Sequence, residues 1–478
     1  MKIQANEPWA HDKMDRQGVA KFLTHYLDND DTIKVLNINA PWGTGKTFFL
    51  ENWKRSEQQN LRACVYFNAW ETDFSGDAFV SMVASIRDQL AEVIGTPQKT
   101  EDILKKFTAK AAQTLIAATP AITKGIVKKL TSIDVDLVSS LIDQEGLADA
   151  AEKAVEKLIE SNKEALNTVH EFKIVFRRLL NLAAATCAAG EDLKPVYIFI
   201  DELDRCRPTF AIELLERIKH LFGVDQCKFI IATDTNQLGE AIRAVYGVGF
   251  DSEKYLRRFF DREFTLKTGD YVGWIKANCE KYSSESFFSL GMVKQLPKNS
   301  HSLRIRNGDR EVPPRKDAEL TENNELDESQ LVILALAKTF KPSLRDLLKI
   351  IRHIDAIHSN IPGQGFHFFW AAYLAFLKIE SPLLYSRALD RNGDIDTSEI
   401  EKNFTPRSFY FYQTNITVHD LFKSYLILYK GTSQDANDQL MRTDRKLQHQ
   451  TNIAMDFSND HARMSLYPKL VDLAHSIE

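Results

Sequence analysis

The chain has 478 residues, of which 44% are hydrophobic and 27% are charged, and its formal net charge at pH 7 is −5. These values are ordinary for a globular protein of two or three domains with a large core, and they argue against a uniformly basic nucleic-acid-binding protein. The five cysteines include no Cys-x-x-Cys pair, so we expect free thiols in the cytoplasm. The first residues contain no apolar stretch, and we expect no signal peptide.

The first predicted elements surround a glycine-rich turn. Apolar residues at helical spacing predict a helix over Met14–Leu27, and the apolar run Ile33–Ile38 predicts a buried strand. The turn after this strand leads into another predicted helix and consists of Pro41, Trp42, Gly43, Thr44, Gly45, Lys46, Thr47 and Phe48. A glycine-rich turn between a strand and a helix, closed by Lys-Thr, is typical of a phosphate-binding loop.

The residue types in this turn suit phosphate chemistry. Glycines let consecutive backbone N–H groups point at phosphate oxygens, and the helix N-terminus adds partial positive charge. Lys46 would reach the β- and γ-phosphates, and the Thr47 hydroxyl would ligate Mg²⁺. Ala40 departs from the usual pattern, which opens with glycine. The alternative interpretation is a plain strand–helix turn with a solvated lysine.

Strands and helices then alternate along the chain. The next expected elements are a strand over Leu61–Phe67 that ends in Asn68-Ala69-Trp70, a helix over Phe79–Val93, a helical insert over about residues 97–168 and a helix over His170–Ala185. The most apolar part of the insert, Ala111–Thr123, is interrupted by Pro120 and is too short to span a membrane. We expect a soluble helical arm there, with a membrane-surface helix as the alternative.

A later strand carries two acids at its end. The run Pro195–Ile200 is apolar, and Asp201 and Glu202 follow it. Asp201 would hold Mg²⁺, mostly through water, and Glu202 would polarise the water that attacks the γ-phosphate. The alternative is a buried strand that ends in two solvated acids.

A helix over Thr209–Leu221 and a strand over Lys228–Asp234 complete the alternation. This order predicts an α/β fold with a parallel sheet and helices on both faces. Ligands bind such sheets beyond the carboxyl ends of the strands, where Lys46, Asp201, Glu202 and Asp234 all fall. Asp234 would contact the γ-phosphate or the attacking water, or would instead start a turn and cap the next helix.

The pattern changes near Gly269. We expect residues 1–268 to form the core domain, residues 269–360 to form a helical lid region with a polar loop at 296–327, and residues 361–478 to form a helical region of unreadable role. Predicted helices lie at Gln330–Phe340, Ser343–Ile357 and Phe366–Ile379. The basic stretch Lys298–Arg310 precedes an acidic one, so a self-neutralising linker is favoured over a nucleic-acid contact.

Three segments together resemble the KAP family of P-loop NTPases. They are Trp-Gly-Thr-Gly-Lys-Thr at Trp42–Thr47, Phe-Asn-Ala-Trp at Phe67–Trp70 and Ile-Asp-Glu-Leu-Asp-Arg-Cys-Arg-Pro at Ile200–Pro208. The last two are specific, because ordinary P-loop ATPases lack them, and the resemblance covers roughly residues 10–360. Family members often carry transmembrane helices between the first two segments and the third, and this chain departs from them there.

The resemblance implies further roles. The family has a Tyr-Leu-x-Lys/Arg-Phe segment where this chain has Arg257, Arg258 and Arg262, and no arginine is evident in the sequence next to the phosphate loop. An arginine of this cluster, with Arg258 the first candidate, would therefore act on the γ-phosphate of a neighbouring molecule. A solvated basic face is the alternative. Arg345 would be a second nucleotide sensor in the helical region, with Arg352 as its alternative.

Four more residues carry weaker expectations. Arg205 is expected to be a structural ion-pair partner of Asp204 rather than a phosphate contact. Trp9 would stack on adenine or pack on the core. Asn68 would position the attacking water or orient Glu202, and Trp70 is expected to pack.

The favoured function is an ATP-hydrolysing, Mg²⁺-dependent switch that acts through self-association or a protein partner. ATP is preferred over GTP because no Asn-Lys-x-Asp element ends a strand; Asn162-Lys163-Glu164-Ala165 lacks the Asp. The family is associated with membrane-linked assemblies and with bacterial phage exclusion, and the second suits a chain without a membrane segment. The alternatives are a nucleotide-binding scaffold with little hydrolysis and, less favoured, a nucleic-acid-dependent ATPase.

Overall fold

The structure is a computed structural model, and it divides the chain into two compact units, residues 1–267 and 268–478. It describes residues 7–75, 77–95, 98–118, 145–188, 193–267, 271–279, 326, 328–361, 366–391, 397–411, 414–431 and 464–477. The polar loop predicted at 296–327, apart from Leu326, and the basic stretch 298–310 lie outside these residues.

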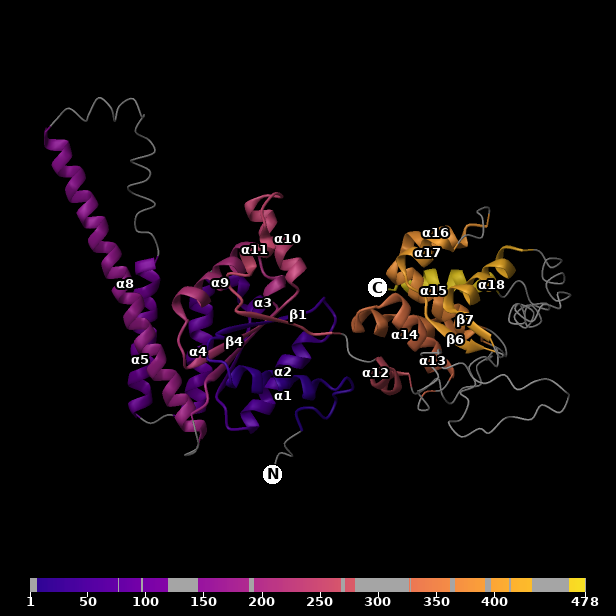
Figure 1. Cartoon of the computed structure of the whole chain (residues 1–478), viewed down its shortest axis with the longest axis horizontal. Coiled ribbons are helices and arrows are strands. Elements are labelled where there is room, and N and C mark those ends of the chain that lie inside the picture. Colours follow the sequence, from indigo (N-terminus) through magenta and orange to yellow (C-terminus); the bar gives the residue numbers. More distant parts are fainter. Residues whose placement is uncertain are drawn as a thin grey trace. The chain divides into compact units, whose positions relative to one another are not determined.

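The first unit is built around a five-stranded sheet (Figure 1). Its strands are β1 (Val35–Asn39), β2 (Cys64–Asn68), β3 (Val196–Asp201), β4 (Cys227–Thr233) and β5 (Arg262–Thr265). They are all parallel and lie in the order β2-β3-β4-β1-β5. The strand before the glycine-rich turn is thus separated by β4 from the strand that carries the two acids, and all carboxyl ends meet at one edge.

Helices cover both faces of this sheet, as the α/β prediction required. They are α1 (Arg16–Asp28), α2 (Lys46–Gln59), α3 (Ala69–Thr72), α4 (Ala78–Ile94), α5 (Gln98–Ala118), α8 (Glu145–Ala188), α9 (Pro208–Leu221), α10 (Thr235–Tyr246) and α11 (Ser252–Leu256), with short 3₁₀ turns η1 (Asp73–Ser75) and η2 (Leu203–Arg205). Alternate strand residues enter two cores, because successive side chains of a strand point to opposite faces. One core joins the sheet to α1 and α2, and the other joins it to α4, α8, α9 and α10.

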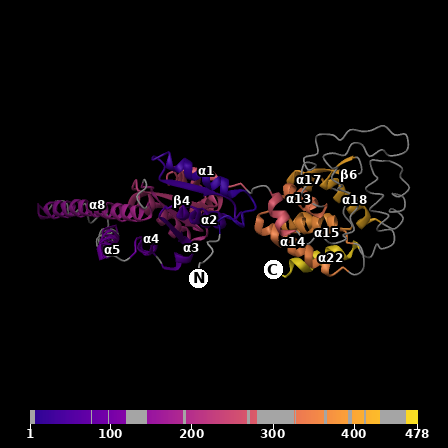
Figure 2. The same cartoon turned by 90° about the horizontal axis from the view of Figure 1, so that it is seen from below.

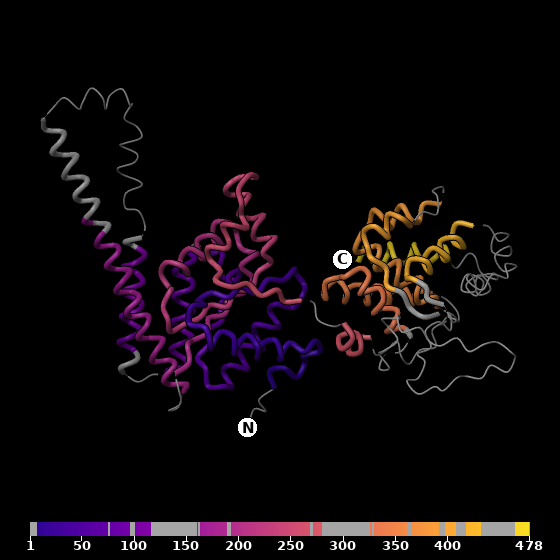
Figure 3. Tube along the Cα trace, viewed as in Figure 1, coloured from indigo at the N-terminus to yellow at the C-terminus, as the bar shows by residue number. Residues whose placement is uncertain are grey.

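The predicted helical insert forms an arm of two helices, α5 and α8, between β2 and β3. They lie side by side in two views (Figure 1, Figure 2), and the Phe107 ring of α5 stacks on Phe172 and Phe176 of α8. Both α8 rings are buried in the sheet core, so the carboxyl-terminal part of α8 anchors the arm. In Figure 3 the coloured part of α8 runs beside α5 as one continuous helix, and along the chain α8 is followed by β3. Among the described helices, none is both long and apolar enough to cross a bilayer.

The second unit is mainly helical. Its elements are α12 (Tyr271–Asn278), α13 (Glu328–Phe340), α14 (Leu344–Ser359), α15 (Phe368–Glu380), α16 (Pro382–Leu389), α17 (Ser398–Asn403), β6 (Ser408–Phe411), β7 (Thr414–Thr417), α18 (Val418–Lys430) and α22 (Leu466–His475). Helix α15 lies at its centre, with ten consecutive buried residues from Phe368 to Leu377. One hydrophobic core includes residues on both sides of position 361, where the sequence pattern predicted a boundary between two regions.

Two expectations about strands were wrong. Strand β5 was not predicted, because this short edge strand is mostly exposed and carries Arg262 and Glu263 instead of an apolar run. Residues 361–478 were expected to be helical, yet β6 and β7 form an antiparallel hairpin there. The prediction of free thiols is confirmed: all five cysteines are free, and all except Cys187 are buried.

Candidate nucleotide site

The glycine-rich turn has the backbone shape that phosphate binding requires. Gly43 and Gly45 adopt positive φ angles of 79° and 84°, a region that favours glycine. Helix α2 starts at Lys46, and the preceding Gly45 provides no side chain to cap it. The first N–H groups of a helix have no intrahelical acceptors, so this helix start can donate to an anion at the carboxyl edge of the sheet.

A buried arginine that no sequence pattern predicted lies behind the turn and holds it by hydrogen bonds. Arg16, the first residue of α1, is 3% exposed. Its Nη1 donates to the Gly45 carbonyl at 2.9 Å and its Nη2 to the Thr44 carbonyl at 2.5 Å. A Cβ on Gly45 would lie 3.0 Å from Arg16 Nη1, so a glycine there leaves room for the guanidinium. The expectation that no arginine of the same chain lies next to the loop was therefore wrong.

Lys46 is buried and faces two acceptors. Its Nζ donates to the Ala40 carbonyl at 2.7 Å and lies 3.5 Å from Asp204 Oδ2. The same Oδ2 accepts the Trp42 indole N–H at 2.7 Å and the Asp234 backbone N–H at 2.8 Å. Asp204 thus joins the loop, the lysine and the end of β4. The interpretation of Lys46 as a solvated surface lysine is excluded.

The two acids at the end of β3, Asp201 and Glu202, are held differently. Asp201 is almost fully buried and accepts the Tyr66 hydroxyl at 2.8 Å and the Glu202 N–H at 2.8 Å. Burial, with the Asp201 carboxylate next in importance, raises the pKa of Tyr66, so this hydroxyl stays a donor. Glu202 has a positive φ of 58° and pairs with Arg205 Nη1 at 3.0 Å. Arg205 therefore pairs with Glu202, not with Asp204 as expected.

The end of β2 is organised by helix capping. The Asn68 side chain accepts the N–H groups of Trp70 and Glu71 at 3.1 and 3.3 Å. Its predicted contact with Glu202 is replaced by this cap. Trp70 is 52% exposed, so the expectation that it packs was wrong; the Arg205 guanidinium lies 5.6 Å from the centre of its ring.

The end of β4 also serves as a cap. Asp234 accepts the N–H groups of Asn236 and Gln237 at 3.2 and 3.3 Å, which is the capping alternative for this residue. The preceding Thr233 is fully buried and donates to Asn37 Oδ1 of β1 at 2.8 Å. Ala40 N–H donates to the Thr233 carbonyl at 3.0 Å, so the ends of β4 and β1 are tied together just before the phosphate loop.

The three arginines that follow α11 lie toward the amino ends of the strands, whereas the phosphate loop lies at their carboxyl ends. Arg262 pairs in register with Leu36, near the start of β1, and its Nε donates to the Tyr26 hydroxyl at 3.2 Å. Arg257 and Arg258 precede β5, so they belong to the amino edge of the sheet, and both are exposed. Within the described part of the chain neither makes an ion pair. The phosphate loop follows the opposite, carboxyl end of β1.

The remaining singled-out residues lie elsewhere. Trp9 packs in the core against Phe48 and Phe49, with ring centroids 6.4 and 6.1 Å apart. Arg345 and Arg352 are exposed on α14 of the second unit, and the predicted cap of that helix is confirmed, because Asp346 N–H donates to Ser343 Oγ at 3.1 Å.

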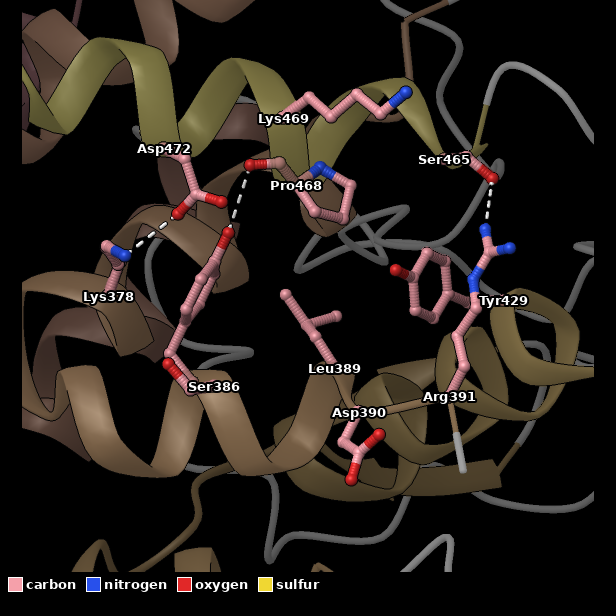
Figure 4. A pocket seen from close by; sticks show the side chains of 11 residues that line it. Lys378, Ser386, Leu389, Asp390, Arg391, Tyr429, Ser465, Pro468, Lys469 and Asp472 are labelled. Atoms are coloured by element: carbon pink, nitrogen blue, oxygen red, sulfur yellow. Dashed lines mark hydrogen bonds and ion pairs between the residues drawn. The ribbon is translucent and has the colours of Figure 1, made fainter. Parts of the chain in front are cut away.

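The second unit contains a pocket of its own (Figure 4). It lies among α15, α16, α18 and α22, and no predicted site residue lines it. Its charges are largely satisfied internally: Lys378 pairs with Asp472 at 2.8 Å, and Arg391 donates to Ser465 Oγ at 2.7 Å. We therefore place the candidate site at the phosphate loop and not here.

The residues at the loop fit a nucleoside triphosphate with magnesium. Phosphates would receive the N–H groups at the start of α2 and the Lys46 ammonium, while the exposed Thr47 hydroxyl and Asp201 could bind a cation. Among the described residues no three His, Cys, Asp or Glu side chains form a preassembled metal site. A magnesium ion would thus take most ligands from phosphate and water.

Comparison with known families agrees with this geometry. The KAP family P-loop domain matches residues 16–360, which is most of the chain and includes the phosphate loop, β3 and β4. A search of curated proteins finds no match. The chain belongs to the KAP family of P-loop NTPases.

Proposed function

We propose that this protein hydrolyses ATP with Mg²⁺ and uses the hydrolysis cycle as a conformational or assembly switch. The observation that carries the proposal is the start of α2. Gly43 and Gly45 turn the backbone, and Lys46 lies buried at the first helical position. The two acids at the end of β3 lie at the same edge of the sheet.

Each residue has a distinct role in this proposal. Backbone groups of residues 41–48 and Lys46 bind the phosphates, while Thr47 and Asp201 hold the cation. Magnesium supplies charge neutralisation of the β- and γ-phosphates when it is bound. Glu202 orients the attacking water and accepts its proton. Because Glu202 pairs with Arg205 at 3.0 Å, it would have to exchange that partner for water.

Self-association completes the proposed site. Arg257 and Arg258 are exposed at the amino edge of the sheet, so either would act only on a nucleotide bound to a neighbouring molecule. An arginine supplied in this way typically accelerates phosphoryl transfer by about 10³-fold or more. Arg345 is proposed as a sensor that links the second unit to the γ-phosphate.

A nucleotide-binding scaffold with little hydrolysis is the second candidate. Two observations favour it: Ala40 replaces the usual glycine, and Glu202 is already engaged by Arg205. In that case ATP would fix a surface on which a partner protein docks. A nucleic-acid-dependent ATPase is less favoured, because the net charge is −5.

The cellular setting is part of the proposal. The KAP resemblance and the finding that no described helix could span a bilayer support a cytoplasmic role in bacterial defence against phage. Plating efficiency of a phage panel on cells with wild-type protein or Lys46→Ala would test this role. Equal plating on both strains would count against it.

The biochemical test is the rate of phosphate release from ATP over a range of protein concentrations, with and without nucleic acid. We expect activity per molecule to rise with concentration and to be insensitive to nucleic acid. Lys46→Ala should abolish binding or turnover, because it removes the buried ammonium of the loop. Wild-type affinity and turnover in Lys46→Ala would refute the site, and tight binding with negligible turnover would favour the scaffold.

A further inference from the structure

Asp204 occupies a position that the phosphate-loop chemistry described above does not use. It lies in η2, three residues after Asp201, and its side chain is 1% exposed. One oxygen, Oδ2, receives three groups from three parts of the site: Trp42 Nε1 at 2.7 Å, Asp234 N at 2.8 Å and Lys46 Nζ at 3.5 Å. The other oxygen, Oδ1, is buried and has no hydrogen-bond partner among the described residues.

This arrangement is costly unless the carboxylate has a function. A buried charge is stable only when it is paired and hydrogen-bonded, and an unmet buried acceptor costs free energy. Here the pairing with Lys46 is long, and the ammonium makes its shorter contact with the Ala40 carbonyl, at 2.7 Å. Replacement by an apolar residue would leave the Asp234 N–H and the Trp42 N–H without their acceptor.

We propose that Asp204 is a positioning residue. Its carboxylate occupies, beside Lys46, the position of an anionic acceptor that a phosphate oxygen would take when a triphosphate binds. A carboxylate oxygen and a phosphate oxygen are alternative anionic acceptors for the same ammonium. A bound triphosphate would therefore compete with Asp204 for Lys46. Since Asp204 also holds Trp42 and the end of β4, a change in its pairing is transmitted to the phosphate loop and to the start of α10.

Two substitutions separate the effect of the Asp204 charge from the effect of the hydrogen bonds that Asp204 accepts. Asp204→Asn keeps an acceptor oxygen for Trp42 and Asp234 but removes the negative charge beside Lys46. Asp204→Ala removes both. Trp42→Phe removes only the indole donor. Asp251→Asn is a matched control, because Asp251 caps a different helix, α11, through the Lys254 N–H at 2.9 Å.

The first measurement needs no nucleotide. Hydrogen exchange of peptides from residues 230–240 reports the Asp234 amide, and the fluorescence difference between wild type and Trp42→Phe reports the indole. We expect Asp204→Ala to speed exchange at the end of β4 by about tenfold or more and to shift Trp42 emission, because both donors lose their acceptor. Asp204→Asn and Asp251→Asn should stay close to wild type. Unchanged exchange and emission in Asp204→Ala would overturn the positioning role.

The second measurement adds Mg²⁺ and a non-hydrolysable ATP analogue, and this arm rests on the proposed function. We expect Asp204→Asn to bind the analogue about tenfold more tightly, because a negative charge near the phosphates is removed. The analogue should alter exchange at 230–240 in wild type but not in Asp204→Ala.

The two hypotheses fail in different ways. If wild type binds the analogue but Asp204→Asn binds it no more tightly than Asp251→Asn, the competition for Lys46 is refuted and the proposed function stands. If wild type binds no nucleotide at all, the proposed function falls and the competition falls with it, whatever the first measurement gives.

Discussion

The support that Arg16 gives to the phosphate loop makes a quantitative prediction. Arg16→Met keeps much of the side-chain volume but removes both donors to the Thr44 and Gly45 carbonyls. A hydrogen bond from a charged donor contributes about 1.5–3 kcal/mol. Burial lowers the pKa of Arg16, which shows that its charge is partly desolvated at some cost. We therefore expect a net loss of about 2–4 kcal/mol in the free energy of unfolding of the first unit.

The same substitution should weaken nucleotide binding. Without the guanidinium, the two carbonyls are free to turn, and the loop must be reordered before its N–H groups can face a phosphate. We expect the dissociation constant for an ATP analogue to rise by about tenfold or more, which corresponds to about 1.4 kcal/mol. Arg16→Lys should fall between wild type and Arg16→Met, because an ammonium keeps the charge but cannot donate as a planar fork.

Urea titration followed by hydrogen exchange of α1 and α2 peptides measures the first effect, and fluorescence titration with an ATP analogue measures the second. Arg55→Met is the matched control, since Arg55 is an exposed arginine on α2, and it should change stability by no more than about 0.5 kcal/mol. An Arg16→Met protein that matches this control in both assays would refute the reasoning.

Three further predictions concern other groups. Glu202→Gln should keep Mg²⁺-ATP binding and lose hydrolysis, whereas Asp201→Asn should weaken Mg²⁺-dependent binding; equal binding defects in calorimetric titration would contradict this division. Arg258→Ala, compared with Arg257→Ala, should flatten the rise of specific ATPase activity with protein concentration, and full activity in both would exclude this cluster. Burial raises the pKa of Glu380 from 4.5 to about 7. The contribution of protonated Glu380 to the free energy of unfolding is therefore fully present below about pH 4.5 and is lost as the pH rises through 7. Thermal unfolding should therefore show a decline in stability between pH 5 and 8 that Glu380→Gln reduces, and an identical pH profile in both proteins would count against it.

The strands of the sheet could be predicted from the sequence where they are buried on both faces, because such strands consist of apolar residues. Strands β1, β3 and β4 are buried nearly throughout, so they read as apolar runs. Strand β5 has a neighbour on one side only and is exposed, so no such run exists. Strands β6 and β7 have only four residues each, too few for an alternating pattern to predict a strand.

The site was predictable only where its residues are neighbours in sequence. Lys46 and Thr47 follow the turn directly, and Asp201 and Glu202 follow their strand. Arg16 lies 29 residues before Gly45, and no local pattern reveals that the start of α1 packs beneath the loop. Asp204 was seen only as a possible partner of Arg205. Its actual contacts with Trp42 and Asp234 span 162 and 30 residues and depend on the order of the strands.

The single-helix construction of α8 has a mechanical consequence. Its 44 residues correspond to a rod about 66 Å long at 1.5 Å per residue. The rod is clamped at its carboxyl-terminal part by Phe172 and Phe176, and the chain continues from it to β3, which ends in Asp201. A lever clamped near one end amplifies motion. From the clamp at Phe172 to the amino-terminal end of α8 at Glu145 the helix is about 40 Å long at 1.5 Å per residue, so a tilt of about 5° at the clamp would displace that end by about 3.5 Å. The arm would thus convert a small angular change at the sheet into a larger displacement of its far end.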